Sequence, residues 1–107
     1  MRSKPGEVEP GQIYRDIDQR SHGAGEFVVT ATVRSRSDVP VFREDASDDE
    51  KARAERVIER ARGSVVALFP LAVVHRPASD RTYRVSIDRL MDPRPDSRGY
   101  EYIGRAR

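Results

Sequence analysis

Cysteine is absent from this chain of 107 residues. Its absence excludes disulfides, thiolate nucleophiles and cysteine-ligated zinc, and is compatible with a reducing compartment. Lysine is scarce as well, because Lys4 and Lys51 are the only lysines among twenty basic residues. The excess of arginine is typical of a GC-rich genome, and arginine binds phosphate or carboxylate well wherever it clusters.

Long apolar runs and a strong net charge are also missing. No stretch approaches the roughly 18–20 apolar residues of a membrane span, and the opening residues MRSKPGEVEPG lack the apolar core of a secretory signal. Charged residues form 36% of the chain, yet the two signs nearly cancel to a net charge of +2. We expect a cytoplasmic protein without a membrane partner and without the strong positive charge of a dedicated nucleic-acid binder.

The length of the chain favours one small domain. The polar opening, with Pro5-Gly6 and Pro10-Gly11, predicts a flexible lead-in over residues 1–10. A single domain over residues 11–104 and a basic tail over residues 105–107 would follow. Apolar residues form only 36% of the chain, so the hydrophobic core should be thin.

The clearest strand signal is RTYRVSIDRL, at Arg81–Leu90. Tyr83, Val85 and Ile87 alternate with polar residues, which is the period of a strand with one buried face. The turn residues between His75 and Arg81 predict a hairpin that leads into this strand. Further strands are predicted at Gln12–Ile17, Glu26–Arg34, Val39–Phe42, Val65–Phe69, Leu71–His75 and Tyr100–Ile103.

The sequence also predicts which face of the first strand is buried and where the most apolar run of the chain bends. In the first strand, Ile13 and Ile17 are expected to point inward and Tyr14 to point outward. The apolar run Ser64–His75 contains Pro70, which removes a backbone donor and predicts a bend between two strand pieces.

One helix is predicted over Asp45–Gly63. Ser47 followed by Glu50 forms a capping-box pattern, and acidic residues fill the first turn, where the helix dipole favours them. The apolar residues Ala54, Val57, Ile58 and Ala61 recur at helical spacing and form one narrow stripe.

These elements predict a mostly-β member of the α+β class. We expect a small SH3-like antiparallel partial barrel with one amphipathic helix inserted at residues 47–62. The expected core consists of Phe27, Val29, Val33, Val57, Ile58, Val66, Leu68, Tyr83, Val85, Ile87 and Leu90.

Both ends of the chain carry a recognisable pattern. The first is PGQIYRDIDQRS, at Pro10–Ser21, and the second is RTYRVSIDRL followed by RGY. The pattern resembles small proteins encoded by actinobacteria and their phages, for which no activity is characterised. That resemblance implies a barrel-like β domain of bacterial or phage origin, with the central helix as an insertion. It is carried by Asp16, Asp18, Arg20, Ser21, Ile87, Arg89, Leu90, Gly99 and Tyr100.

Few residues suit catalysis or metal binding. Asp16, Asp18 and His22 together would suit a divalent cation or acid–base work. The simpler interpretation, which we prefer, is that the two carboxylates pair with nearby arginines and turn amides. His22 and His75 are the only histidines and lie in no recognisable triad pattern. No catalytic residue, metal ligand or cofactor is therefore assigned.

Arginines and tyrosines offer a different chemistry. Small β-barrels bind single strands by placing arginine on phosphate and an aromatic ring on a base. The alternative is that Tyr83 belongs to the core and that the arginines solvate the exposed face and pair with Asp88 and Glu101. The candidate residues for nucleic-acid binding are Arg20, Arg84, Arg89, Arg98, Tyr100 and Tyr102.

We therefore expect a non-catalytic binding module that recognises a protein or a nucleic acid. An edge strand at Val39–Phe42 is compatible with a homodimer. The alternative function is a small toxin-like endoribonuclease barrel, which would use Arg20 with Thr30 or Thr32.

Overall fold

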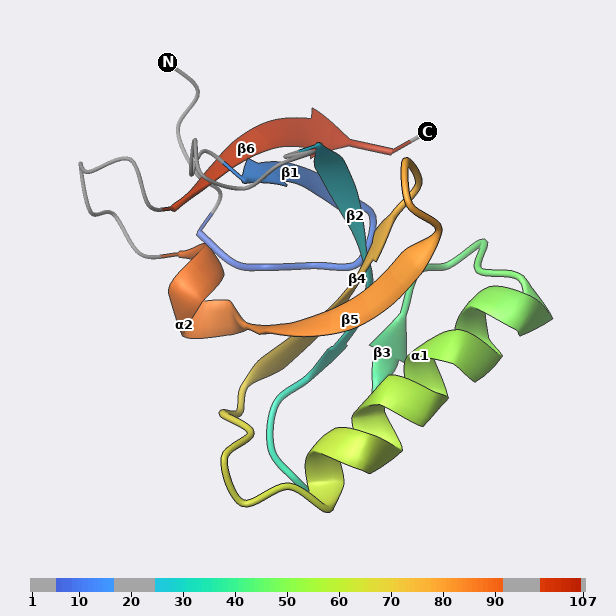
Figure 1. Ribbon diagram of the computed structural model, residues 1–107, viewed down its shortest axis with the longest axis vertical. Helices are drawn as coiled ribbons and strands as arrows, with labels where there is room; N and C mark the ends of the chain where they lie inside the picture. Colours follow the sequence, from blue (N-terminus) through green and yellow to red (C-terminus); the bar gives the residue numbers. More distant parts are fainter. Residues whose placement is uncertain (1–5, 17–24, 92–98, 107) are drawn as a thin grey trace.

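The computed structural model describes residues 6–16, 25–91 and 99–106. These residues form an antiparallel sheet and two helices (Figure 1). No helix among them is long and apolar enough to cross a membrane. The elements in chain order are β1 (Gln12–Asp16), β2 (Glu26–Val33), β3 (Val41–Phe42), α1 (Asp48–Arg62), β4 (Leu71–Arg76), β5 (Arg81–Ser86), α2 (Ile87–Leu90) and β6 (Tyr100–Arg105).

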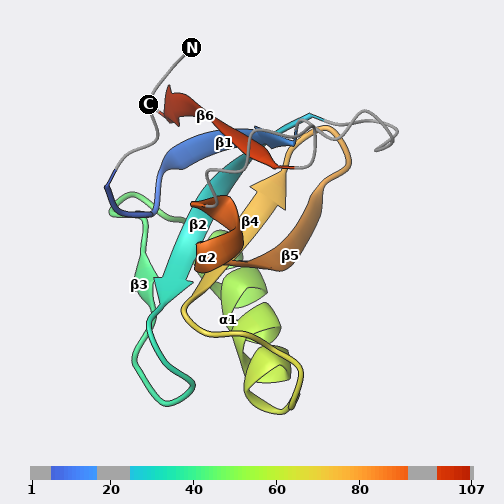
Figure 2. The same ribbon diagram turned by 90° about the vertical axis from the view of Figure 1, so that its left-hand side faces the viewer.

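The six strands form one sheet that is not closed into a barrel. Five of them follow the order β5-β4-β2-β1-β6, and β3 pairs with β2 beside this path. No described ladder joins β5 to β6, so these are the two end strands of the path. Figures 1 and 2 both show α2 between these end strands.

A β-bulge at Thr30 divides the core into two parts. In the pairing of β2 with β4, Val29 faces Val74 and Ala31 faces Val73, so Thr30 is the extra residue. Its hydroxyl donates to the Val73 carbonyl at 3.2 Å. Because one inserted residue reverses the alternation of side chains, β2 serves two clusters. One holds Phe27 and Val29, and the other holds Ala31 and Val33.

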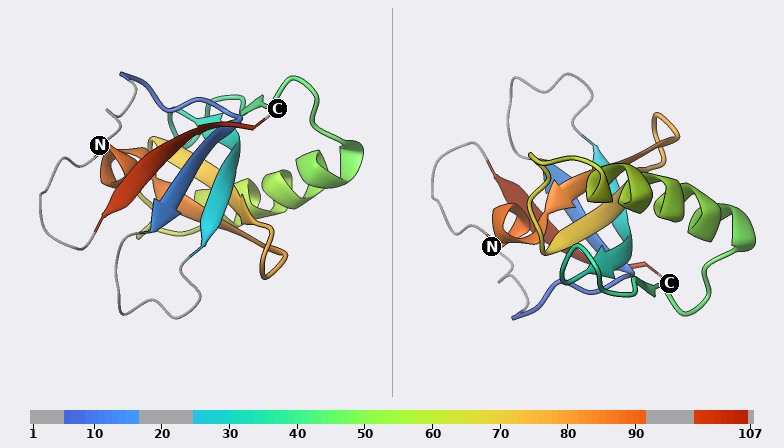
Figure 3. Two further views of the ribbon diagram at one scale, coloured as in Figure 1. Left: turned by 90° about the horizontal axis from the view of Figure 1, so that it is seen from above. Right: turned by 90° about the horizontal axis from the view of Figure 1, so that it is seen from below.

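Helix α1 covers the second cluster. Its predicted stripe is confirmed, since Ala54, Ile58 and Ala61 are buried and Val57 packs beside them. The predicted cap is confirmed too, because the Ser47 hydroxyl accepts a hydrogen bond from the Glu50 amide at 3.2 Å. The helix lies across β2, β4 and β5, as the view from below shows (Figure 3).

The expected orientation of β1 is wrong. Tyr14 is completely buried, whereas Ile13 is only partly buried. A buried phenol needs a hydrogen-bond partner, and Gln12, two residues away on the same face, accepts from the Tyr14 hydroxyl at 2.9 Å. The sequence pattern was ambiguous because each face of this short strand carries one large residue.

The expected strand Val65–Phe69 is also absent from the structure. Residues 64–70 form a loop, here named the 64–70 loop, in which Val66 is 75% exposed and Leu68 is 67% exposed. Both residues were assigned to the core, and both assignments are wrong. The second strand piece is present as β4, which pairs with β5 as the predicted hairpin.

Strand β5 is shorter than the alternation suggested. Tyr83 and Val85 face the first cluster as predicted, but the strand ends at Ser86 and the chain turns into α2. The Ile87 amide donates to the Pro70 carbonyl at 3.0 Å, and Leu90 is fully buried. The helical spacing of α2 therefore places Leu90 in the core, whereas Ile87 is only partly buried and packs against the edge of the core.

Ionisation of Tyr14 should weaken the fold at high pH. Burial is the main cause that raises the pKa of Tyr14 to about 12, and the nearby Tyr102 adds to it. The folded state then holds its proton more tightly than the unfolded state, so the free energy of unfolding falls as pH rises above the unfolded pKa. We expect a loss of about 2 kcal/mol from this group between about pH 9 and about pH 11.5, measured by urea denaturation.

Tyr14→Phe is the control for this effect. It should cost about 1 kcal/mol near neutral pH, because the hydrogen bond to Gln12 is lost. It should also flatten the alkaline decline. A decline as steep as that of the unchanged protein would contradict the assignment to Tyr14.

Candidate functional site

Two open grooves meet between the end strands of the sheet. Each measures about 580 Å³, and Tyr83 and Tyr100 line both. The loop groove runs beside the 64–70 loop and is also lined by Arg84, Arg89 and several aliphatic side chains. The hairpin groove runs beside the β4–β5 turn. The two grooves together are termed the seam.

Phe27 holds the two seam tyrosines in place. The centre of the Phe27 ring lies 5.6 Å from the centre of the Tyr100 ring, in an edge-to-face arrangement, and 6.3 Å from the centre of the Tyr83 ring. One tyrosine comes from β5 and the other from β6, so a single buried ring on β2 supports both end strands. Both tyrosines are half-buried and border open space.

Arg76 lies against Tyr83 in the hairpin groove. Its guanidinium carbon is 5.8 Å from the centre of the Tyr83 ring, and its Nη2 donates to the Tyr83 hydroxyl at 3.1 Å. A cation over an aromatic ring stabilises the orientation of both groups. Tyr83 is therefore positioned from two sides, by Phe27 beneath it and by Arg76.

The Tyr100 hydroxyl stays protonated at physiological pH. Burial raises its pKa above the ordinary value, and Asp16 and Tyr83 add to this effect, while Arg89 and Arg76 oppose it. A protonated phenol donates a hydrogen bond, which suits an acceptor such as a phosphate oxygen or a base carbonyl.

Three arginines of the seam have no charged partner among the described residues: Arg81, Arg84 and Arg89. Several arginines outside the seam do form ion pairs with carboxylates, for example Arg43 with Glu50 at 3.0 Å. The acidic residues that line the seam are Asp16 in the hairpin groove and Asp88 in the loop groove. Positive charge therefore exceeds negative charge along the lining of both grooves.

Arg36 holds the 64–70 loop against the end of α1. Its Nη1 donates to the carbonyls of Ala61, Arg62 and Ser64 at 3.1, 2.9 and 2.8 Å, and its Nη2 donates to Ala67 at 3.3 Å. The guanidinium also lies 5.1 Å from the centre of the Phe69 ring. Several charge-assisted hydrogen bonds from one side chain order a loop effectively. The aliphatic wall of the loop groove is therefore built on an anchored loop.

The structure brings together part of the sequence-derived site. Arg84, Arg89 and Tyr100 line the seam, whereas Arg20 and Arg98 lie outside the described residues. Tyr102 packs edge-on against Tyr14, with ring centres 5.5 Å apart, and lines neither groove.

Sequence reasoning missed two basic residues of the seam, Arg76 and Arg81. They form a cross-strand pair in the β4–β5 hairpin. The signal was present, because arginines flank both sides of the predicted turn. Only the curvature of the sheet shows that these residues lie beside Tyr100, which is distant in sequence.

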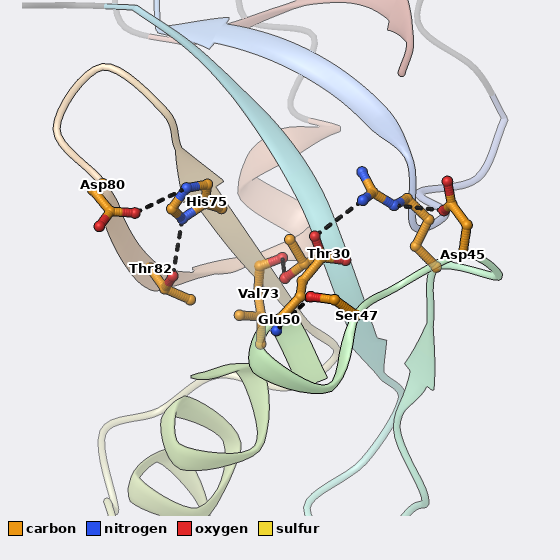
Figure 4. A network of polar contacts seen from close by, with 9 residues as sticks. Thr30, Asp45, Ser47, Glu50, Val73, His75, Asp80 and Thr82 are labelled. Atoms are coloured by element: carbon orange, nitrogen blue, oxygen red, sulfur yellow. Dashed lines mark hydrogen bonds and ion pairs between the residues drawn. The ribbon is translucent and has the colours of Figure 1, made fainter. Parts of the chain in front are cut away.

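A smaller pocket, of about 180 Å³, lies at the start of α1 and is lined by polar side chains. Figure 4 shows several of these side chains and their contacts. His75 Nδ1 lies 3.1 Å from the Thr82 hydroxyl, and His75 Nε2 lies 3.5 Å from Asp80. Asp80 also accepts from Arg53 at 2.9 Å. The charged groups of this network are paired with one another, so we interpret it as a structural link between the hairpin and α1.

The described residues contain no cluster of side chains that would support the metal hypothesis. Within residues 6–16, 25–91 and 99–106, no group of three or more His, Cys, Asp or Glu side chains suits a metal ion. Asp16 borders the hairpin groove, and Asp18 and His22 lie outside the described residues.

Comparison with known proteins adds no assignment. No protein-family model, no curated protein and no solved structure matches the chain. The chemistry of the seam must therefore be inferred from the residues that form it.

Proposed function

We propose that this protein is a non-catalytic module that binds single-stranded nucleic acid along the seam. One observation carries the proposal: three arginines without a described charged partner surround two half-buried tyrosines beside open grooves. A basic groove with aromatic rings is the usual arrangement for single strands, because every base has a face that can stack.

The shape of the seam favours a single strand over a duplex. The tyrosines are half-buried between β5 and β6, so a ligand must reach into the grooves to contact them. Unpaired bases can be turned toward a protein, whereas the bases of a duplex are stacked and paired. The two grooves share their central tyrosines, which suits an extended ligand that passes from one to the other.

We also propose that the sheet is an SH3-like partial barrel and that the protein comes from a bacterium or a phage. An open, curved sheet whose end strands both contact Phe27 is compatible with an SH3-like partial barrel from a bacterium or phage. Residues that carry the resemblance to the actinobacterial and phage proteins border the seam, among them Asp16, Arg89 and Tyr100. Residues from both parts of the pattern thus border the proposed site.

A protein ligand is the other class of partner, and a second copy of the chain is one form of it. The exposed valines of the β3 region, Val39 at 84% and Val41 at 59%, would suit such contacts. The unpaired charge at the seam favours nucleic acid as the first hypothesis to test.

The endoribonuclease alternative is weaker. Thr30 is 1% exposed and its hydroxyl is used by Val73, and Thr32 lines a separate groove with Val39 and Val41. Arg20 lies outside the described residues. Nothing described near the seam arginines supplies a general base other than the carboxylates of Asp16 and Asp88.

A salt titration tests the proposal. Three phosphate contacts on a single strand give a logarithmic salt slope of about −2, so affinity should fall about 20-fold between about 50 and about 200 mM salt. Single- and double-stranded DNA and RNA of equal length would be compared by fluorescence anisotropy. We expect single strands to bind more tightly than duplexes. No binding at low salt would overturn the proposal and direct the search to protein partners.

A further inference from the structure

The 64–70 loop presents an unusual concentration of exposed aliphatic residues. Val65 is 95% exposed, Val66 75% and Leu68 67%, which makes three large apolar side chains in four positions. Single exposed apolar residues are ordinary, but a cluster beside a groove indicates a binding surface. Arg36 joins two carbonyls of this loop, those of Ser64 and Ala67, to two carbonyls at the end of α1, so the cluster is presented in a defined position.

Only part of this cluster belongs to the seam. Val66 and Leu68 line the loop groove, where they lie with Leu71, Val85 and Tyr100, while Val65 is not part of the lining. Arg84 and Arg89 border the same groove. The loop groove therefore combines an aliphatic wall, an aromatic ring and two cationic side chains within one volume of about 580 Å³. The hairpin groove has Ala78 as its one described aliphatic lining residue.

We infer that the loop groove holds the unpaired bases of the strand, against the wall formed by Val66, Leu68 and Tyr100. This inference rests on the proposed function and divides the seam into two parts. Bases lie in the loop groove. Phosphates lie along its rim at Arg84 and Arg89, and continue past Tyr83 to Arg81 in the hairpin groove.

Charge favours bases over an apolar peptide as the occupant. A nucleobase is flat and weakly polar, and it is always attached to a phosphate, so it needs apolar surface and a cation side by side. The loop groove provides both, because Val66 and Leu68 lie in the same lining as Arg84 and Arg89, neither of which has a described charged partner. The volume lies within the usual range for small-molecule sites, about 300–1,000 Å³.

The test compares an ordinary single strand with an abasic strand of the same length. Both carry the same phosphates, so they differ only in the groups that the wall would hold. We expect the ordinary strand to bind the unchanged protein about tenfold or more tightly than the abasic strand. Leu68→Ser and Val66→Ser should each lower affinity for the ordinary strand severalfold, leave the salt slope unchanged and leave abasic binding unaffected.

Val65→Ser is the matched control, because Val65 lies on the same loop but not in the groove. It should bind both strands as the unchanged protein does. All three positions are exposed, so these variants should fold, which thermal denaturation would verify.

Three results would overturn the inference. Equal affinity for ordinary and abasic strands would show that the seam binds only the phosphates of the strand. The proposed function would then stand without base binding. Equal effects of Val65→Ser and Leu68→Ser would show that the groove is not the site. A dimer of the unchanged protein that Leu68→Ser dissociates in sedimentation would assign the wall to a second copy of the chain. Failure of the proposed function is distinct, because neither strand would then bind at low salt.

Discussion

Phe27→Ala should destabilise the protein by about 3–5 kcal/mol, the typical cost of deleting a fully buried aromatic side chain. Phe27 is completely buried, and its ring contacts Tyr14, Tyr83 and Tyr100 from three different strands. Removing it takes away the common support of both end strands. Because small domains have only about 5–15 kcal/mol of stability in total, chemical denaturation should show a large shift of the midpoint.

The comparison variant is Phe42→Ala. Phe42 is half-buried on the two-residue strand β3 and packs beside the cluster under α1. Its loss should cost about 1–2 kcal/mol, because less buried surface is removed. Similar costs for the two variants would contradict the central position of Phe27.

Arg84→Gln combined with Arg89→Gln should have the largest effect on binding. Two fewer phosphate contacts should reduce the magnitude of the logarithmic salt slope by about 1.4. By the same relation, affinity for a single strand should fall roughly 70-fold at about 50 mM salt and roughly 10-fold at about 200 mM salt. Both side chains lie at the surface without a described charged partner, so the fold should be unaffected.

A matched control separates the seam from the overall charge. Arg56→Gln combined with Arg60→Gln changes the net charge equally, at exposed positions on α1. The control pair should retain nearly all the affinity of the unchanged protein. If it lost as much as the seam pair, binding would be a diffuse response to charge, and the seam would not be the site.

The candidate site was only partly predictable from the sequence. Arg84, Arg89 and Tyr100 were identified because their residue types suit phosphate and base. Arg76 and Arg81 were missed, since nothing in their local pattern places them beside Tyr100. Val66 and Leu68 were misassigned to the core, because they lie in the most apolar run of the chain and their residue types are typical of a strand.

Local patterns in the sequence determined the elements with strong periodicity. The Ser47 cap and the stripe through Ala54 and Ile58 specify α1, because helix start signals and apolar spacing act within a few residues. The same holds for the β4–β5 hairpin, where turn residues join two apolar runs. The buried side of β5 also followed from its alternation up to Val85.

Only the tertiary structure decided which faces of the sheet are covered and where the sheet stays open. One extra residue at Thr30 turns β2 from one core cluster to the other, and alternation alone cannot reveal such an insertion. Tyr14 is buried because Gln12 satisfies its hydroxyl, a contact that hydrophobic pattern does not encode. The seam exists because β5 and β6 approach the same Phe27 ring without pairing, which depends on the curvature of the whole sheet.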